Sequence, residues 1–208
     1  MALFHKIGQS IKAAESEFES ISEERKRNLI MLSDYISEKI SSGDTAKLTF
    51  ICTHNSRRSH MSQVWAQTAA AYYGIDNVQT YSGGTEATAL NPRAAAALKR
   101  AGFEIEKSDD SDNPVYRVTY GAGMNPMEVF SKKFDEKPNP REDYCAVMTC
   151  AKAESDCPFV PGASYRVSLP YDDPKDFDGT PLETATYDER RRQIAREMLW
   201  AFSRIKAH

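Results

Sequence analysis

The stretch LTFICTHNSRRSHMSQVWAQTAAAYY, residues 48–73, decides the fold. Its first four residues are apolar or β-branched, which predicts a short buried strand over 48–51. The next eight residues are polar, and a helix is predicted from about Ser59 to Tyr73. One face of that helix carries Met61, Val64, Trp65 and Thr68. A strand that passes through a tight polar loop into a helix is the opening of a βαβ unit.

The rest of the chain continues the alternation of strands and helices. Further strands are predicted at 77–82, 144–149 and 165–170. Helix boundaries are indicated by the N-cap and proline pair Asn91–Pro92, by Gly102, and by a capping box of Thr186 and Glu189. This order predicts an α/β fold with a four-stranded parallel sheet and helices on both faces. Ligands of such sheets bind beside the carboxyl ends of the strands.

Two segments stand outside this pattern. Residues 1–45 are predicted as a helical extension of two antiparallel helices, broken near Ser20–Ser22, where Ser20 and Glu23 fit a capping box. We expect this extension to be a packing or dimerising appendage to an α/β domain over 46–208. Within that domain, residues 108–141 are rich in Pro, Asp, Lys and Gly. They are predicted as an insertion with one short strand and one short helix.

Composition excludes several classes of protein. The 208 residues contain 27 Lys and Arg against 30 Asp and Glu, so the net charge of −3 argues against a nucleic-acid partner. No apolar run reaches the length of about eighteen residues that a membrane helix needs, and the N-terminal stretch does not fit a signal peptide. We therefore expect a cytoplasmic protein without a membrane partner. Four cysteines are too few for a disulfide scaffold and are candidates for chemistry.

The polar loop has the properties of an oxyanion site. Backbone N–H groups of such a loop converge on one point, and the helix N-terminus adds partial positive charge there. Arg58 can offer two hydrogen bonds to the bound anion, and the same positive field favours the thiolate form of Cys52 as a nucleophile. Ser59 can donate to that thiolate. The candidate oxyanion-binding residues are Thr53, His54, Asn55, Ser56, Arg57 and Ser59. The alternative is that Cys52 is simply a buried strand end.

Two more strand ends carry reactive side chains. Cys150 follows the third predicted strand and Cys157 lies seven positions later, a spacing that allows a disulfide if the intervening chain rearranges. Further thiols are what reduction of an oxyanion requires, although the two cysteines could be incidental. Cys145 is expected in the core, and the cysteine spacing disfavours zinc, so no metal or cofactor is predicted. Asp172 and Asp173 follow the fourth strand, where a carboxylic acid could protonate a leaving oxygen, and ordinary turn chemistry is the alternative for Asp173.

These motifs resemble a known group. C-x5-R-S at the first strand–helix junction is similar to the low-molecular-weight protein tyrosine phosphatase fold, and CTHNSRRSHMSQ resembles the CTHNSARSQMAE form of thioredoxin-coupled arsenate reductases. The stretch YSGGTEATALNPRAAAAL and the pattern C-x-x-A-x-x-x-C-P-x-x-P from Cys150 also resemble those reductases. The resemblance implies that Cys52 attacks arsenate, Asp173 protonates the departing oxygen, and Cys150 and Cys157 pass a disulfide to a thioredoxin-like reductant.

Two other functions remain open on the sequence. Cys52, Arg58 and Asp173 alone would suffice for a phosphatase that hydrolyses phosphotyrosine or a small phosphomonoester. A phosphate- or arsenate-sensing module would bind the oxyanion without turning it over. In that case binding would survive Cys52→Ser.

Overall fold

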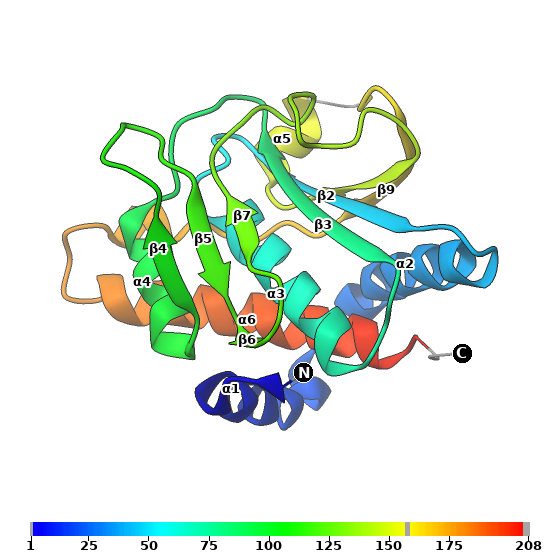
Figure 1. The fold of residues 1–208 in the computed structure, drawn as a ribbon, viewed down its shortest axis with the longest axis horizontal. Helices are drawn as coiled ribbons and strands as arrows, with labels where there is room; N and C mark the ends of the chain where they lie inside the picture. The colour runs from blue at the N-terminus through cyan, green and yellow to red at the C-terminus, as the bar shows by residue number, and fades with distance from the viewer. Residues whose placement is uncertain (1, 157–158, 206–208) are drawn as a thin grey trace.

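The computed structural model describes residues 2–156 and 159–205, and its centre is a parallel sheet of four strands. The strand order is β3-β2-β8-β9 (Figure 1). The strands are β2 (Ala46–Cys52), β3 (Val78–Gly84), β8 (Tyr144–Met148) and β9 (Ala163–Ser168). Leu48 is in register with Thr80 on one side and Cys145 on the other. The predicted fold class is confirmed.

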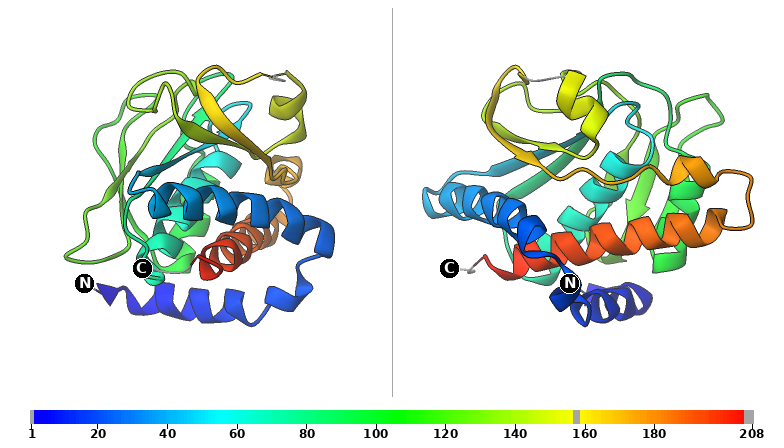
Figure 2. Two further views of the ribbon diagram at one scale, coloured as in Figure 1. Left: turned by 90° about the vertical axis from the view of Figure 1, so that its right-hand side faces the viewer. Right: turned by 180° about the vertical axis from the view of Figure 1, so that it is seen from behind.

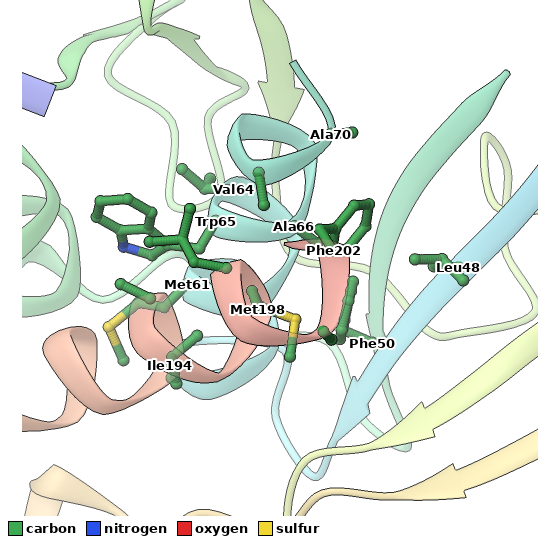
Figure 3. Packing of buried hydrophobic residues seen from close by; sticks show 14 of the residues in the cluster. Leu48, Phe50, Met61, Val64, Trp65, Ala66, Ala70, Ile194, Met198 and Phe202 are labelled. Atoms are coloured by element: carbon green, nitrogen blue, oxygen red, sulfur yellow. The ribbon is translucent and has the colours of Figure 1, made fainter. Parts of the chain in front are cut away.

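Helices cover both faces of this sheet. The larger core contains the apolar sides of α2 (Glu23–Ser41), α3 (Arg58–Tyr72), α4 (Pro92–Ala101) and α6 (Glu183–Ser203). Figure 3 shows Met198 of α6 beside Phe50 of β2, and Trp65 of α3 in the same cluster. On the other face, α5 (Ala151–Asp156) adjoins a smaller cluster that includes Cys52 and Cys150. Because β2 and β8 end at the same edge, residues that follow them are brought together.

The N-terminal segment is a strand and two helices packed on α6. Strand β1 (Ala2–Leu3) pairs with β6 (Gly121–Ala122), and α1 (His5–Glu15) buries Ile7 and Ile11. A single 3₁₀ turn, η1 (Phe18–Ser20), separates α1 from α2, and Figure 2 shows α2 running beside α6. The capping box predicted at Ser20 is wrong. Ser22 caps α2 by accepting a hydrogen bond from Arg25 N, because η1 still includes Ser20.

The segment between α4 and β8 folds differently from the prediction. Strands β4 (Glu104–Lys107), β5 (Tyr116–Thr119) and β7 (Met127–Val129) form an antiparallel sheet. Residues 108–141, all described, contain no helix, so the short helix expected there is wrong. Val118 and Val129 are fully buried, and pairing of β5 with β7 satisfies their backbone groups, which favours strands over a helix.

The last helix begins one turn earlier than its predicted capping box. It starts at Glu183, whose carboxylate accepts a hydrogen bond from Gly179 N and pairs with Arg93. These contacts fix the first turn without the box of Thr186 and Glu189. A 3₁₀ turn, η2 (Pro174–Phe177), precedes it. Among the helices of the described chain, none combines the length and apolar character needed to cross a membrane.

Candidate active site

The polar loop connects the last residue of β2, Cys52, to the first residue of α3, Arg58, and packs closely on β3. A Cβ atom added to Gly84 would lie 2.3 Å from Glu86 O and 2.8 Å from Asn55 N. Both are backbone atoms that cannot move aside without changing the loop. Glycine at the end of β3 therefore lets the loop approach the sheet.

The carbonyl groups of this loop face the surrounding scaffold. Those of Thr53, His54 and Ser56 accept hydrogen bonds from Glu86 N (2.8 Å), Ser131 Oγ (3.1 Å) and Asn91 N (2.9 Å), respectively. In a trans peptide the N–H group points away from the C=O of the same unit. The amides of His54, Asn55 and Arg57 therefore face the opposite side. Beside the loop lies a small hollow lined by Cys52, His54, Ser56, Arg57, Arg58 and Asp173. Loop amides that are turned away from the scaffold near a cysteine can form a cradle for an oxyanion.

Asn55 holds the loop in this shape. Its φ of 44° lies in the left-handed region, which asparagine tolerates better than most residues. Its side chain is fully buried, accepts a hydrogen bond from Lys132 N at 2.9 Å, and donates to Ser59 Oγ at 2.9 Å. Ser59 Oγ lies 3.1 Å from Cys52 Sγ. Hydrogen bonds therefore connect Lys132 N through Asn55 and Ser59 to the sulfur of Cys52. The part of Lys132 in this chain of contacts was not predicted from the sequence.

Arg58 and Asp173, which both line the hollow, form an ion pair. One guanidinium nitrogen, Nη1, donates to Tyr171 O at 2.8 Å, and the other, Nη2, donates to Asp173 Oδ2 at 2.8 Å. Asp173 is also the N-cap of η2, where its Oδ1 accepts from Lys175 N. Arg57 Nη1 lies 3.8 Å from the same Oδ1. Two guanidinium groups thus share one carboxylate beside the sulfur of Cys52.

Cys150 lies at the same edge of the sheet, just after β8. Its side chain is buried, and its Sγ accepts a hydrogen bond from Ala153 N at 3.3 Å. The same Sγ is 3.5 Å from Thr53 Oγ1, so it contacts the residue that follows Cys52. Cys145 lies in the core cluster on the opposite face, where burial raises the pKa of its thiol. Cys157 lies outside the described residues.

The remaining side chains of the loop are bonded to the scaffold or face its rim. Ser56 Oγ donates to Ala89 O, and the His54 ring lies 3.7 Å from Glu86. Arg57 Nε donates to the hydroxyl of Tyr187, a buried residue of α6 that sequence patterns marked only as part of a helix. Within the described ranges, no group of three or more His, Cys, Asp or Glu side chains is arranged to hold a metal ion.

His60, the residue after Ser59, is buried behind the loop. Burial and the nearby Lys132 ammonium lower the pKa of His60 to about 3, and its Nε2 lies 3.3 Å from Phe130 O. A neutral, buried imidazole serves the packing of α3 rather than proton transfer. Burial also lowers the pKa of Lys132 to about 8. No sequence pattern connected Lys132 with the loop, because the two are 77 positions apart.

A cysteine beneath inward amides, opposite an arginine and a carboxylate, is the arrangement of enzymes that attack oxyanions with a thiolate. The profile of the family described as "Low molecular weight phosphotyrosine protein phosphatase" matches residues 47–117. Arsenate reductase of Bacillus subtilis is 31% identical over 145 residues, which are 69% of this chain and 84% of that protein. Arsenate reductase of Halalkalibacterium halodurans is 30% identical over 150 residues, 72% of this chain and 89% of that protein.

Solved structures share the fold. A mutant of YwlE from Bacillus subtilis has a TM-score of 0.52 and 16% identity over 78% of this chain and 100% of that one. Arsenate reductase from Archaeoglobus fulgidus has a TM-score of 0.51 and 17% identity over 75% of this chain and 98% of that one. The chain therefore belongs to the superfamily of low-molecular-weight phosphotyrosine protein phosphatases and arsenate reductases, and it is an enzyme of that superfamily.

Proposed function

We propose that this enzyme reduces arsenate to arsenite with the Cys52 thiolate and a disulfide relay through Cys150. The contact of Cys150 Sγ with Thr53 Oγ1, at 3.5 Å, carries the proposal. It puts a second thiol beside the oxyanion cradle, where a hydrolase needs only one. The similarity to curated arsenate reductases supports the same chemistry.

The first step is binding and attack. The inward amides and Arg58 hold the oxyanion, and the thiolate of Cys52 forms a bond to arsenic. Arg58 keeps further N–H groups for the anion after donating to Tyr171 O and Asp173. Protonated Asp173 gives its proton to a hydroxyl group of the arsenate as the bond from arsenic to that oxygen breaks, so the hydroxyl leaves as water.

The second step is electron transfer between sulfur and arsenic. The Cys150 thiolate attacks the sulfur of Cys52, and the sulfur–arsenic bond breaks. Its electron pair stays on arsenic, which passes from arsenic(V) to arsenic(III) and leaves as arsenite. The two sulfurs give up two electrons and are joined as a disulfide. Cys157, which lies outside the described residues, then attacks Cys150 and releases Cys52.

A dithiol protein of the thioredoxin class would reduce the Cys150–Cys157 disulfide by exchange, and both of its thiols would be oxidised. Such reductants keep protein thiols reduced in the cytoplasm, so a cytoplasmic location is part of the proposal. The relay needs no metal and no organic cofactor.

Substitution of the second thiol tests this relay. Cys150→Ser should stop multiple turnover, because the adduct on Cys52 can form but cannot be released as arsenite. Arsenite production with thioredoxin and thioredoxin reductase is the measurement. Cys145→Ala is the matched control, since Cys145 is buried on the other face of the sheet and should leave turnover unchanged. Sustained turnover by Cys150→Ser would contradict the relay.

One observation favours a second activity, hydrolysis of a small phosphomonoester or phosphotyrosine. A cavity of about 320 Å³ adjoins the catalytic hollow and shares His54, Ser56 and Arg57 with it. An inorganic oxyanion does not need this space, whereas an ester leaving group would fill it. Hydrolysis of p-nitrophenyl phosphate, measured beside arsenate reduction, separates the two activities. A phosphatase alone would be unaffected by Cys150→Ser.

A further inference from the structure

The N-terminal helix α2 reaches the active site through Arg25. Arg25 lies in the first turn of α2, and its guanidinium carbon is 4.6 Å from the centre of the Tyr171 ring. The same guanidinium binds Glu197 of α6, with Nη2 at 2.7 Å and Nε at 2.8 Å from Oε2. Glu197 is only 2% exposed, so its charge requires this partner. Arg25 is therefore fixed from one side and covers Tyr171 on the other.

Tyr171 in turn holds the catalytic arginine. Its ring is buried, its N–H donates to Thr149 O at 3.1 Å, and its carbonyl accepts from Arg58 Nη1 at 2.8 Å. Asp173 follows two residues later and binds the other guanidinium nitrogen of Arg58. A movement of the Tyr171 ring would shift the backbone between β9 and η2, on which both contacts of Arg58 depend.

We propose that Arg25 is a positioning residue of the active site, and that α2 serves to keep Tyr171 and thereby Arg58 in the orientation that receives the oxyanion. The inference rests on the proposed role of Arg58 in oxyanion binding. It gives the N-terminal segment, which lies before the residues 47–117 matched by the family profile, a direct part in the site.

A second ion pair of the same segment provides a control. Arg196 of α6 binds Glu17, which lies between α1 and η1, at 3.1 Å. Breaking that pair loosens the N-terminal segment without touching the connection to Arg58. A loss of phosphate affinity that came merely from loosening the N-terminal segment would therefore also appear when this second pair is broken, whereas a positioning effect belongs to Arg25 alone.

The experiment measures the affinity of the full chain for inorganic phosphate by titration calorimetry. Arg25→Met combined with Glu197→Met removes the pair without leaving a buried charge, a replacement that folded proteins commonly tolerate. We expect the phosphate dissociation constant to rise roughly two- to thirtyfold, the range found for residues that act through a neighbour. Arg25→Lys keeps the charge but not the planar group over Tyr171, and its phosphate dissociation constant should lie between those of the wild type and the double variant. Arg196→Gln should bind as the wild type does.

A second readout follows the charge at the sulfur. Iodoacetate is an anion and iodoacetamide is neutral, so the ratio of their rates of alkylation at Cys52, followed by peptide mass spectrometry, reports how Arg58 faces the thiolate. This ratio should fall in the double variant and in Arg25→Lys, but not in Arg196→Gln. Circular dichroism establishes that each variant is folded, and if the double variant is not, Arg25→Lys decides.

The outcomes separate this inference from the proposed function. Wild-type phosphate affinity and an unchanged alkylation ratio in a folded Arg25 variant would overturn the positioning role, and so would an equal loss in Arg196→Gln. A wild-type chain that binds phosphate but does not reduce arsenate would refute the proposed reaction only. A wild-type chain that binds no phosphate would refute the oxyanion site and this inference together.

Discussion

Asn55→Ala is the substitution that most directly tests how the oxyanion loop is held. It removes the acceptor of Lys132 N and the donor to Ser59 Oγ, both at 2.9 Å and both buried. A buried amide without a partner costs about 1–3 kcal/mol. Alanine at a φ of 44° adds about 1–2 kcal/mol, because its Cβ crowds the backbone in the left-handed region. The free energy of unfolding should therefore fall by about 2–5 kcal/mol.

The matched control is Asn77→Ala. Asn77 also has a positive φ, 60°, but it is exposed in the turn before β3, far along the chain from the loop. This variant carries the backbone cost alone, about 1–2 kcal/mol. Urea unfolding followed by circular dichroism gives both values, and the difference between them isolates the two buried hydrogen bonds. For a chain of this size, each kcal/mol lost from the free energy of unfolding lowers the melting temperature by about 2–4 °C.

Phosphate affinity provides the functional half of the same test. Asn55→Ala should weaken phosphate binding in the protein that remains folded, because the loop amides lose their fixed direction, whereas Asn77→Ala should not. If the two variants lost the same free energy of unfolding within about 0.5 kcal/mol, and bound phosphate equally well, the side chain of Asn55 would not hold the loop.

Three further predictions follow from individual contacts. Gly84→Ala should lower the free energy of unfolding by about 1–3 kcal/mol or more and abolish phosphate binding, because the new Cβ would meet Glu86 O. Gly8→Ala is the control: it has open space around it and should leave the free energy of unfolding unchanged or raise it, as urea unfolding measures. Asp173→Asn should lower turnover about 10²- to 10⁴-fold in protein that still folds, because Asn caps η2 as well as Asp does although it gives up the charge that Arg58 binds; turnover at the wild-type rate would contradict the acid role. Because the pKa of His60 is lowered to about 3, the unfolded chain binds one more proton between pH 3 and 6.5. Stability should be fully present above pH 6.5 and fall below it by about 1.4 kcal/mol per pH unit, and urea unfolding of His60→Gln should lack that contribution.

Local patterns predicted much of the fold. The strand, the loop and the helix around Cys52 could be predicted because each is determined by residues that are close together in the sequence. Asn91 caps α4 and Gly102 ends it in the left-handed conformation, as their residue types indicated. The rule that ligands gather at the carboxyl ends of parallel strands also directed attention to Asp173, which the structure places against Arg58.

Contacts between distant segments were not predictable. Lys132 N reaches Asn55 from a segment without helical or strand periodicity, and nothing in its composition marks it as part of the site. Arg25 meets Tyr171 only because α2 packs beside α6, and an arginine in a helical first turn is ordinarily a solvated residue. Such side chains become visible only when the packing of the elements is known.

The charges around the hollow fit the proposed oxyanion ligand. Arg57 and Arg58 face a single carboxylate, Asp173, so one positive charge is left without a partner beside Cys52. The side chains of the two arginines are only 11% and 12% exposed, and charges held this far from water are weakly screened. The proposed oxyanion would supply negative charge to balance it. In the proposed mechanism the anion binds to the further N–H groups of Arg58 while Nη2 stays on Asp173. The ion pair of Arg58 and Asp173 therefore joins the proposed oxyanion-binding group to the proposed general acid.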